Sequence, residues 1–152
     1  MTVDRRTAGL LALVALAALP LRAQDGPVET RLEARKVVRA ADGRESLVAA
    51  ESVRPGDVIE YVATYRNAGD HAVRALEATL PIPANTELLP GSIRPAGARA
   101  SLDATTFAAL PLKRGKELVP AREYRYLRWH VPRLDPRQAV SFSARVRVLD
   151  EP

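Results

Sequence analysis

Residues 140–148 read Val-Ser-Phe-Ser-Ala-Arg-Val-Arg-Val, so apolar and polar side chains alternate at every position. Successive side chains of a β-strand point to opposite faces of a sheet, and strict alternation therefore predicts a strand with one buried and one exposed face. A helix would need a period near 3.6 residues, and no stretch beyond residue 23 keeps that period over three turns. This stretch indicates a β protein.

Residues 124–131 alternate in the same way. Leu127, Trp129 and Val131 share one face, and we expect Trp129 to fill the centre of the core. The segment formed by residues 132–137 is short and contains two prolines, which is typical of a turn. We therefore expect the last two strands to pair with each other as a hairpin.

Turn signals divide the rest of the chain into short segments. They are Asp42-Gly43, Arg54-Pro55-Gly56-Asp57 and Asn67-Ala68-Gly69-Asp70. Between them we expect strands over residues 28–40, 45–52, 58–66 and 72–80, with weaker candidates at 86–89, 98–102 and 105–108 and a loop tip at 113–117. Seven or eight short strands favour an all-β, immunoglobulin-like β-sandwich, with a small barrel as the competing architecture.

Residues 1–23 have the pattern of a secretory signal peptide. The basic pair Arg5-Arg6 precedes an apolar run, and the segment ends on the small residue Ala23. We expect cleavage after Ala23, one domain over residues 24–152, and a periplasmic or extracellular location. An uncleaved anchor is the alternative, although the apolar run is shorter than the roughly 20 residues that span a bilayer.

Composition limits the partners. The chain has 152 residues, no cysteine and a net charge of +5. The signal segment holds three arginines and one aspartate, so the remaining domain is less basic than the whole chain. This charge is compatible with acidic envelope polymers, while dispersed arginines in an exported chain argue against nucleic acid. With no disulfides, the core alone must stabilise the domain.

Catalytic and metal-binding patterns are weak. His71 and His130 are the only histidines, and without cysteine two isolated histidines predict no metal site. Asn67, Asp70 and Asp103 offer fewer oxygens than the six to eight that calcium needs, so we interpret them as turn residues. No serine lies in a Gly-x-Ser-x-Gly motif. We expect no cofactor and no enzyme activity, and an exported enzyme is the weakest alternative.

The predicted hairpin would present tyrosine and arginine side chains together, a combination enriched at binding surfaces. Its outward face would carry Tyr124, Tyr126, Arg128, His130, Arg145 and Arg147, beside Ser141 and Ser143. We expect this face to bind an envelope or surface component, either a protein or an acidic polymer. The alternative is a solvated basic face that binds no ligand.

The order of several motifs resembles the bacterial conserved repeat domain, domain of unknown function 11. The motifs are Pro55-Gly56-Asp57, Asn67-Ala68-Gly69-Asp70, Leu80-Pro81-Ile82-Pro83-Ala84-Asn85-Thr86, Pro90-Gly91-Ser92, Ser101-Leu102-Asp103 and Tyr124-Arg125-Tyr126-Leu127-Arg128-Trp129. The resemblance covers residues 30–149 and implies an immunoglobulin-like sandwich with structural or adhesive roles and no catalytic residues. Two turns depart from the family, which often has Asp-Gly at Asp103-Ala104 and Pro-Gly at Pro136-Arg137.

Two functions follow as expectations. The first is a non-enzymatic, exported binding or scaffold module of the cell envelope. The second is a structural subunit that associates through an exposed edge strand, for which Val28 to Ala40 is the candidate edge.

Overall fold

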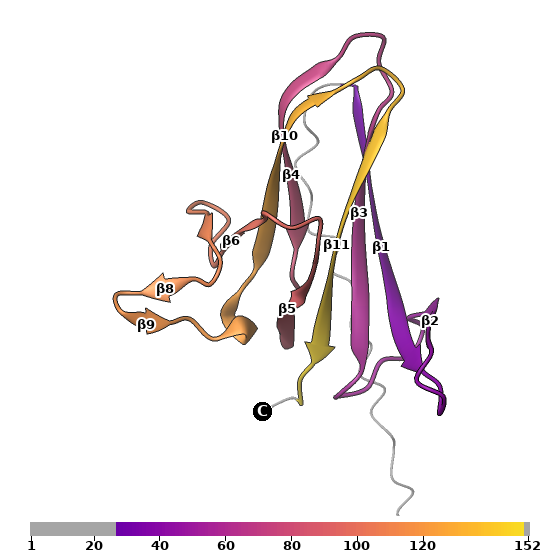
Figure 1. The fold of residues 1–152 in the computed structure, drawn as a ribbon, viewed down its shortest axis with the longest axis vertical. Coiled ribbons are helices and arrows are strands. Elements are labelled where there is room, and N and C mark those ends of the chain that lie inside the picture. Colours follow the sequence, from indigo (N-terminus) through magenta and orange to yellow (C-terminus); the bar gives the residue numbers. More distant parts are fainter. Residues whose placement is uncertain (1–26, 151–152) are drawn as a thin grey trace, which may run out of the picture.

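The computed structural model describes residues 27–150, which form two antiparallel sheets packed face to face (Figure 1). The elements are β1 (Val28–Arg39), β2 (Glu45–Ala49), β3 (Val58–Asn67), β4 (Val73–Pro81), β5 (Thr86–Arg94), β6 (Arg99–Ser101), β7 (Ala108–Ala109), β8 (Lys113–Arg114), β9 (Glu117–Leu118), the 3-10 turn η1 (Ala121–Glu123), β10 (Tyr126–Leu134) and β11 (Ala139–Val148). One sheet has the order β2-β1-β3-β11-β5 and the other β4-β10-β6-β7, while β8 and β9 form a small separate hairpin. The all-β sandwich is confirmed. The predicted signal peptide, residues 1–23, lies outside the described residues.

The core follows the period of two. In β3, Ile59, Tyr61, Ala63 and Tyr65 are buried while the residues between them are partly exposed. Trp129 is buried as predicted, and its ring stacks on Phe142 of the opposite sheet with a centroid distance of 4.7 Å. Burial of each such large side chain stabilises the fold by about 1.5–3 kcal/mol.

The predicted pairing of the last two strands is wrong. β10 pairs with β4 and β6, whereas β11 pairs with β3 and β5, so the two strands lie in different sheets. In immunoglobulin constant domains the last two strands are neighbours in one sheet. Here the chain crosses between the sheets over residues 135–138, where the backbone of Asn67 bonds Arg137 and Gln138 (N···O 2.9 and 2.8 Å).

The side chain of Asn67 holds this crossing in place. It is fully buried, and its Nδ2 donates to the carbonyls of His71 (2.8 Å) and Leu134 (3.0 Å), while its Oδ1 accepts from the Gly69 amide (3.0 Å). The turn interpretation of Asn67 is thus confirmed. Gly69 is needed for a close approach and not for its φ, which is not positive: a Cβ there would lie 2.6 Å from the Cβ of Pro27.

Three further predictions can be compared with the structure. The turns predicted at Asp42-Gly43 and Arg54-Pro55-Gly56-Asp57 are confirmed, and Gly43 and Gly56 have positive φ there (83° and 87°). Arg35–Arg39 of β1 pair with the outer strand β2, so β1 is an open edge only over residues 28–34. The prediction that all of Val28 to Ala40 forms the edge is therefore wrong. The short strand β7 takes the place of the strand predicted at 105–108. No helix within residues 27–150 is long and apolar enough to cross a membrane.

Candidate binding face

The predicted binding residues divide between the two outer faces of the sandwich. Tyr126, Arg128 and His130 alternate along β10 on the outer face of the four-stranded sheet. Arg145 and Arg147 lie on β11, on the outer face of the five-stranded sheet. Because the last two strands belong to different sheets, these residues do not form the single surface that was expected.

Tyr124 belongs to neither face. Its side chain is 3% exposed, and its hydroxyl accepts a hydrogen bond from the Leu112 amide (2.9 Å). The ring therefore anchors the long segment before β10 to the core. Its inclusion in the predicted surface was wrong, because the alternation of β10 begins only at Tyr126.

Arg128 lies at the centre of an arrangement that we call the arginine–phenylalanine cluster, formed by Arg99, Phe107 and Arg128. The Arg128 guanidinium lies 3.6 Å from the centroid of the Phe107 ring, and its Nε donates to the hydroxyl of Thr79 (3.2 Å). Arg99 is the direct cross-strand neighbour of Arg128, and its Nη2 donates to the Phe107 carbonyl (2.6 Å). Three strands and one loop thus hold two arginines, which are cross-strand neighbours, against the same phenylalanine.

The charges of this cluster are not compensated. Most arginines of the fold have a carboxylate partner, as Arg31 has in Glu33 and Arg137 in Asp70. Within residues 27–150, neither Arg99 nor Arg128 forms an ion pair. Like charges directly opposite each other on neighbouring strands are destabilising. An anion placed between them would remove that repulsion.

Two residues extend the face along β10. Tyr126 is half-buried and lies one row from Arg128, opposite Pro81 of β4. On the other side, His130 Nδ1 lies 2.6 Å from Glu77 Oε1, and both side chains are exposed. Glu77 therefore gives this end of the face a negative group, and the cationic part of the face extends from Arg128 toward β6.

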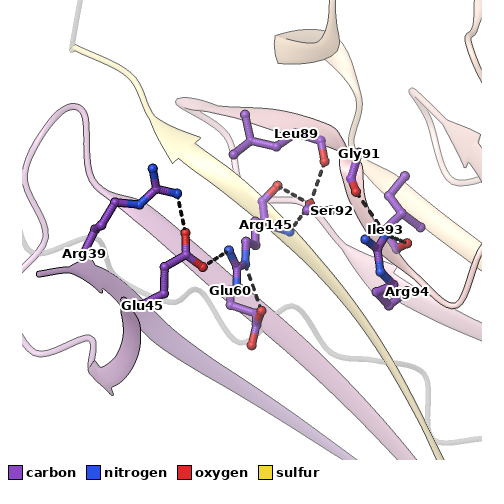
Figure 2. Close-up of polar contacts among 9 residues, drawn as sticks. All are labelled: Arg39, Glu45, Glu60, Leu89, Gly91, Ser92, Ile93, Arg94 and Arg145. Atoms are coloured by element: carbon purple, nitrogen blue, oxygen red, sulfur yellow. Dashed lines mark hydrogen bonds and ion pairs between the residues drawn. The ribbon is translucent and has the colours of Figure 1, made fainter. Parts of the chain in front are cut away.

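Arg145 is occupied by carboxylates of its own sheet (Figure 2). Its Nε donates to Glu60 (3.0 Å) and its Nη1 to Glu45 (2.8 Å), and Glu45 also accepts from Arg39 (2.7 Å). These bonds lower the pKa of Glu45 and raise that of Arg145. Arg147 lies 3.9 Å from Glu87. Arg145 thus ties β11 to β3 and to the β1–β2 hairpin, and Arg147 lies beside β5; both have carboxylate neighbours within their own sheet, which makes them poorer candidates for binding an anion.

A hollow of about 540 Å³ lies beside Arg145, at the irregular pairing of β11 with β5. Ser92 supplies hydrogen bonds where the backbone pairing of β11 with β5 is interrupted: its hydroxyl donates to the Leu89 carbonyl (2.6 Å) and accepts from the Arg145 amide (2.7 Å). The Arg94 guanidinium donates to the carbonyls of Gly91 and Ile93. The polar groups of the hollow are therefore largely bonded to one another.

The structure places the residues considered for metal binding and catalysis in separate surroundings. Among residues 27–150, no group of three histidine, aspartate or glutamate side chains is arranged to hold a metal ion. Asp103 accepts hydrogen bonds from the amides of Thr106 and Thr105 within its own turn, which lowers its pKa. The Ser101 hydroxyl donates to Asp103 and accepts from amides of the same turn.

Sequence reasoning missed Arg99, Phe107 and Thr79 as parts of the face. Arg99 and Phe107 fell within weak strand candidates, and only the pairing of β10 with β4 and β6 brings them beside Arg128. The sequence signal that points toward them is the outward position of Arg128 in a clear period-two strand.

No family model matches the chain, and no curated protein or solved structure matches it. The resemblance to the conserved repeat domain remains a hypothesis.

Proposed function

We propose that this chain is a non-enzymatic, exported binding module whose ligand is an acidic polymer of the bacterial envelope. The observation that carries the proposal is the arginine–phenylalanine cluster, in which Arg99 and Arg128 are cross-strand neighbours without a carboxylate partner among the described residues. The signal-like segment at residues 1–23 supports export.

The geometry of the cluster favours an oxyanion. Arginine binds carboxylate and phosphate through two parallel N–H···O bonds, and its charge persists at every physiological pH. Phe107 holds the guanidinium plane of Arg128 by a cation–π contact. The Thr79 hydroxyl accepts a hydrogen bond from Nε of Arg128 and restrains the same side chain, so less rotamer freedom is lost when an anion binds.

The position of the cluster favours a polymer. It lies on an extended sheet face and not in a closed pocket, so a chain of repeating units can cross it while neighbouring units contact Tyr126. A tyrosine ring offers apolar area and a hydroxyl to such units.

The test is co-sedimentation of the exported protein with isolated bacterial envelope. We expect Arg99→Gln with Arg128→Gln to abolish retention, and Tyr126→Ala to weaken it. Arg31→Gln with Arg66→Gln is the matched control, because it removes the same charge from arginines that are ion-paired on the other sheet.

Equal retention of the cluster variant and the wild type would contradict the proposal. Digesting the envelope with protease beforehand separates the two classes of partner. Retention that survives digestion indicates an acidic polymer, whereas retention that is lost indicates a protein and would overturn the polymer assignment.

A further inference from the structure

The open edges of the two sheets are protected to very different degrees. An unpaired edge strand is a template for another strand, and proteins block it with prolines, bulges, charges or short length. On the edge of β4, the Tyr65 hydroxyl accepts from the Thr79 amide (2.8 Å) and donates to the Thr79 carbonyl (2.7 Å). Ala75 has a φ of 52°, and Pro81 has no amide hydrogen. β4 is therefore blocked.

Three other edges are also protected. β5 is interrupted at Pro90–Ser92, where its pairing with β11 shifts register, and β7 has only two residues. The open part of β1, residues 28–34, alternates charged side chains that include the Arg31–Glu33 ion pair.

β2 is less protected: its pairing with β1 has no bulge, and its one charged residue, Glu45, is already paired with Arg39 and Arg145. It is the outermost strand of the five-stranded sheet and has the sequence Glu-Ser-Leu-Val-Ala, without proline, glycine or lysine (Figure 1). Leu47 and Val48 are 42% and 43% exposed, and both belong to the small set of large apolar side chains that the fold leaves in solvent. An extended, apolar and unblocked edge fits another β-strand.

We propose that two copies of this chain pair through β2, antiparallel about a two-fold axis at Leu47. In this register Leu47 faces Leu47 of the second copy. Because Val37 is the cross-strand neighbour of Leu47 within each copy, four apolar side chains form one continuous row across the joined sheets.

The charges fit the same register. Glu45 faces Ala49 of the second copy, and Arg35, the neighbour of Ala49 within that copy, lies next in the row. Shifting the axis to Val48 would instead place Glu45 opposite Glu51. A contact that satisfies both copies identically is the requirement for a closed dimer, and this self-complementarity is the reason to assign a second copy and not an unrelated strand.

This inference goes beyond the proposed function and does not depend on it. β2 belongs to the five-stranded sheet, and the arginine–phenylalanine cluster lies on the outer face of the other sheet. Pairing through β2 therefore leaves the cluster of each copy exposed.

The test is sedimentation velocity of the exported protein over a concentration series. We expect a dimer whose fraction rises with concentration. Leu47→Lys and Leu47→Glu should each remain monomeric, because like charges would face each other across the axis. Leu118→Lys, at the 63% exposed apolar residue of β9, should dimerise as the wild type does.

Mixing the two Leu47 variants gives the decisive result. Opposite charges then face each other only if the axis lies at Leu47, so the mixture should form heterodimers, which also shows that both variants are folded. A monomeric wild type, a Leu47→Lys protein that still dimerises, or a mixture that stays monomeric would each overturn the proposal.

Discussion

Replacing Asn67 with alanine should destabilise the fold by about 3 kcal/mol, since it removes three hydrogen bonds worth about 1 kcal/mol each. The side chain donates to the carbonyls of His71 and Leu134 and accepts from the Gly69 amide. Asn67 ends β3 in one sheet, whereas Leu134 ends β10 in the other, so one bond ties the sheets together where the chain crosses. The loss corresponds to a fall in Tm of about 10 °C for a domain of this size.

Thermal and urea denaturation of the purified variants measure the effect. Asn67→Asp should be nearly as harmful, because a carboxylate keeps the acceptor for Gly69 but faces two carbonyl oxygens without a donor. Gln138→Ala is the control, since Gln138 accepts from Asn67 through its backbone carbonyl only, and we expect a change within about 0.5 kcal/mol. A loss below about 1 kcal/mol for Asn67→Ala, or wild-type stability of Asn67→Asp, would refute this account of the crossing.

Three further predictions concern stability. Tyr65→Phe should cost about 1–2 kcal/mol in urea unfolding, because the hydroxyl satisfies both the amide and the carbonyl of Thr79; an unchanged midpoint would contradict this. Ala104→Gly should raise the Tm, since Ala104 has a φ of 67° and relief of about 1–2 kcal/mol of backbone strain outweighs the added chain entropy; a lower Tm would show otherwise. The pKa of Asp103 is depressed below 3.8, chiefly by the Thr106 amide, so its contribution to stability is present above that pH and is lost on acidification; Asp103→Asn should flatten this part of the stability profile, and an identical profile would exclude the effect.

Period-two alternation predicted the strands and their buried faces, because burial of one face is a local property of the sequence. Val140 to Val148 and the core position of Trp129 were both identified in this way. The pairing partner of each strand was not predicted, because the period specifies which side chains point inward and not which neighbouring strand bonds the backbone.

The candidate site shows the same limit. Tyr126, Arg128 and His130 were assigned to one outward face correctly, since they alternate within one strand. Arg145 and Arg147 were joined to them only through the assumed hairpin, and the crossing at Asn67 separates them. The long-range contacts that make the arginine–phenylalanine cluster could not be predicted without the sheet order.

Two turn positions have a backbone conformation that favours glycine but carry other residues. Ala104 and Arg137 stand where the resembled family often has glycine, and both have positive φ, 67° and 64°. Both turns therefore place a residue with a Cβ in a conformation that favours glycine, at some cost in strain.

The central claim is that Arg99 and Arg128 together bind an acidic polymer. Titration of the protein comprising residues 24–152 with inorganic polyphosphate and with poly-L-glutamate, followed by calorimetry at several salt concentrations, tests it most directly. The account predicts salt-sensitive binding of at least one polymer that is lost in Arg99→Gln with Arg128→Gln and kept in Arg31→Gln with Arg66→Gln. Equal losses in the two double variants, or no binding by the wild type at low salt, would contradict it.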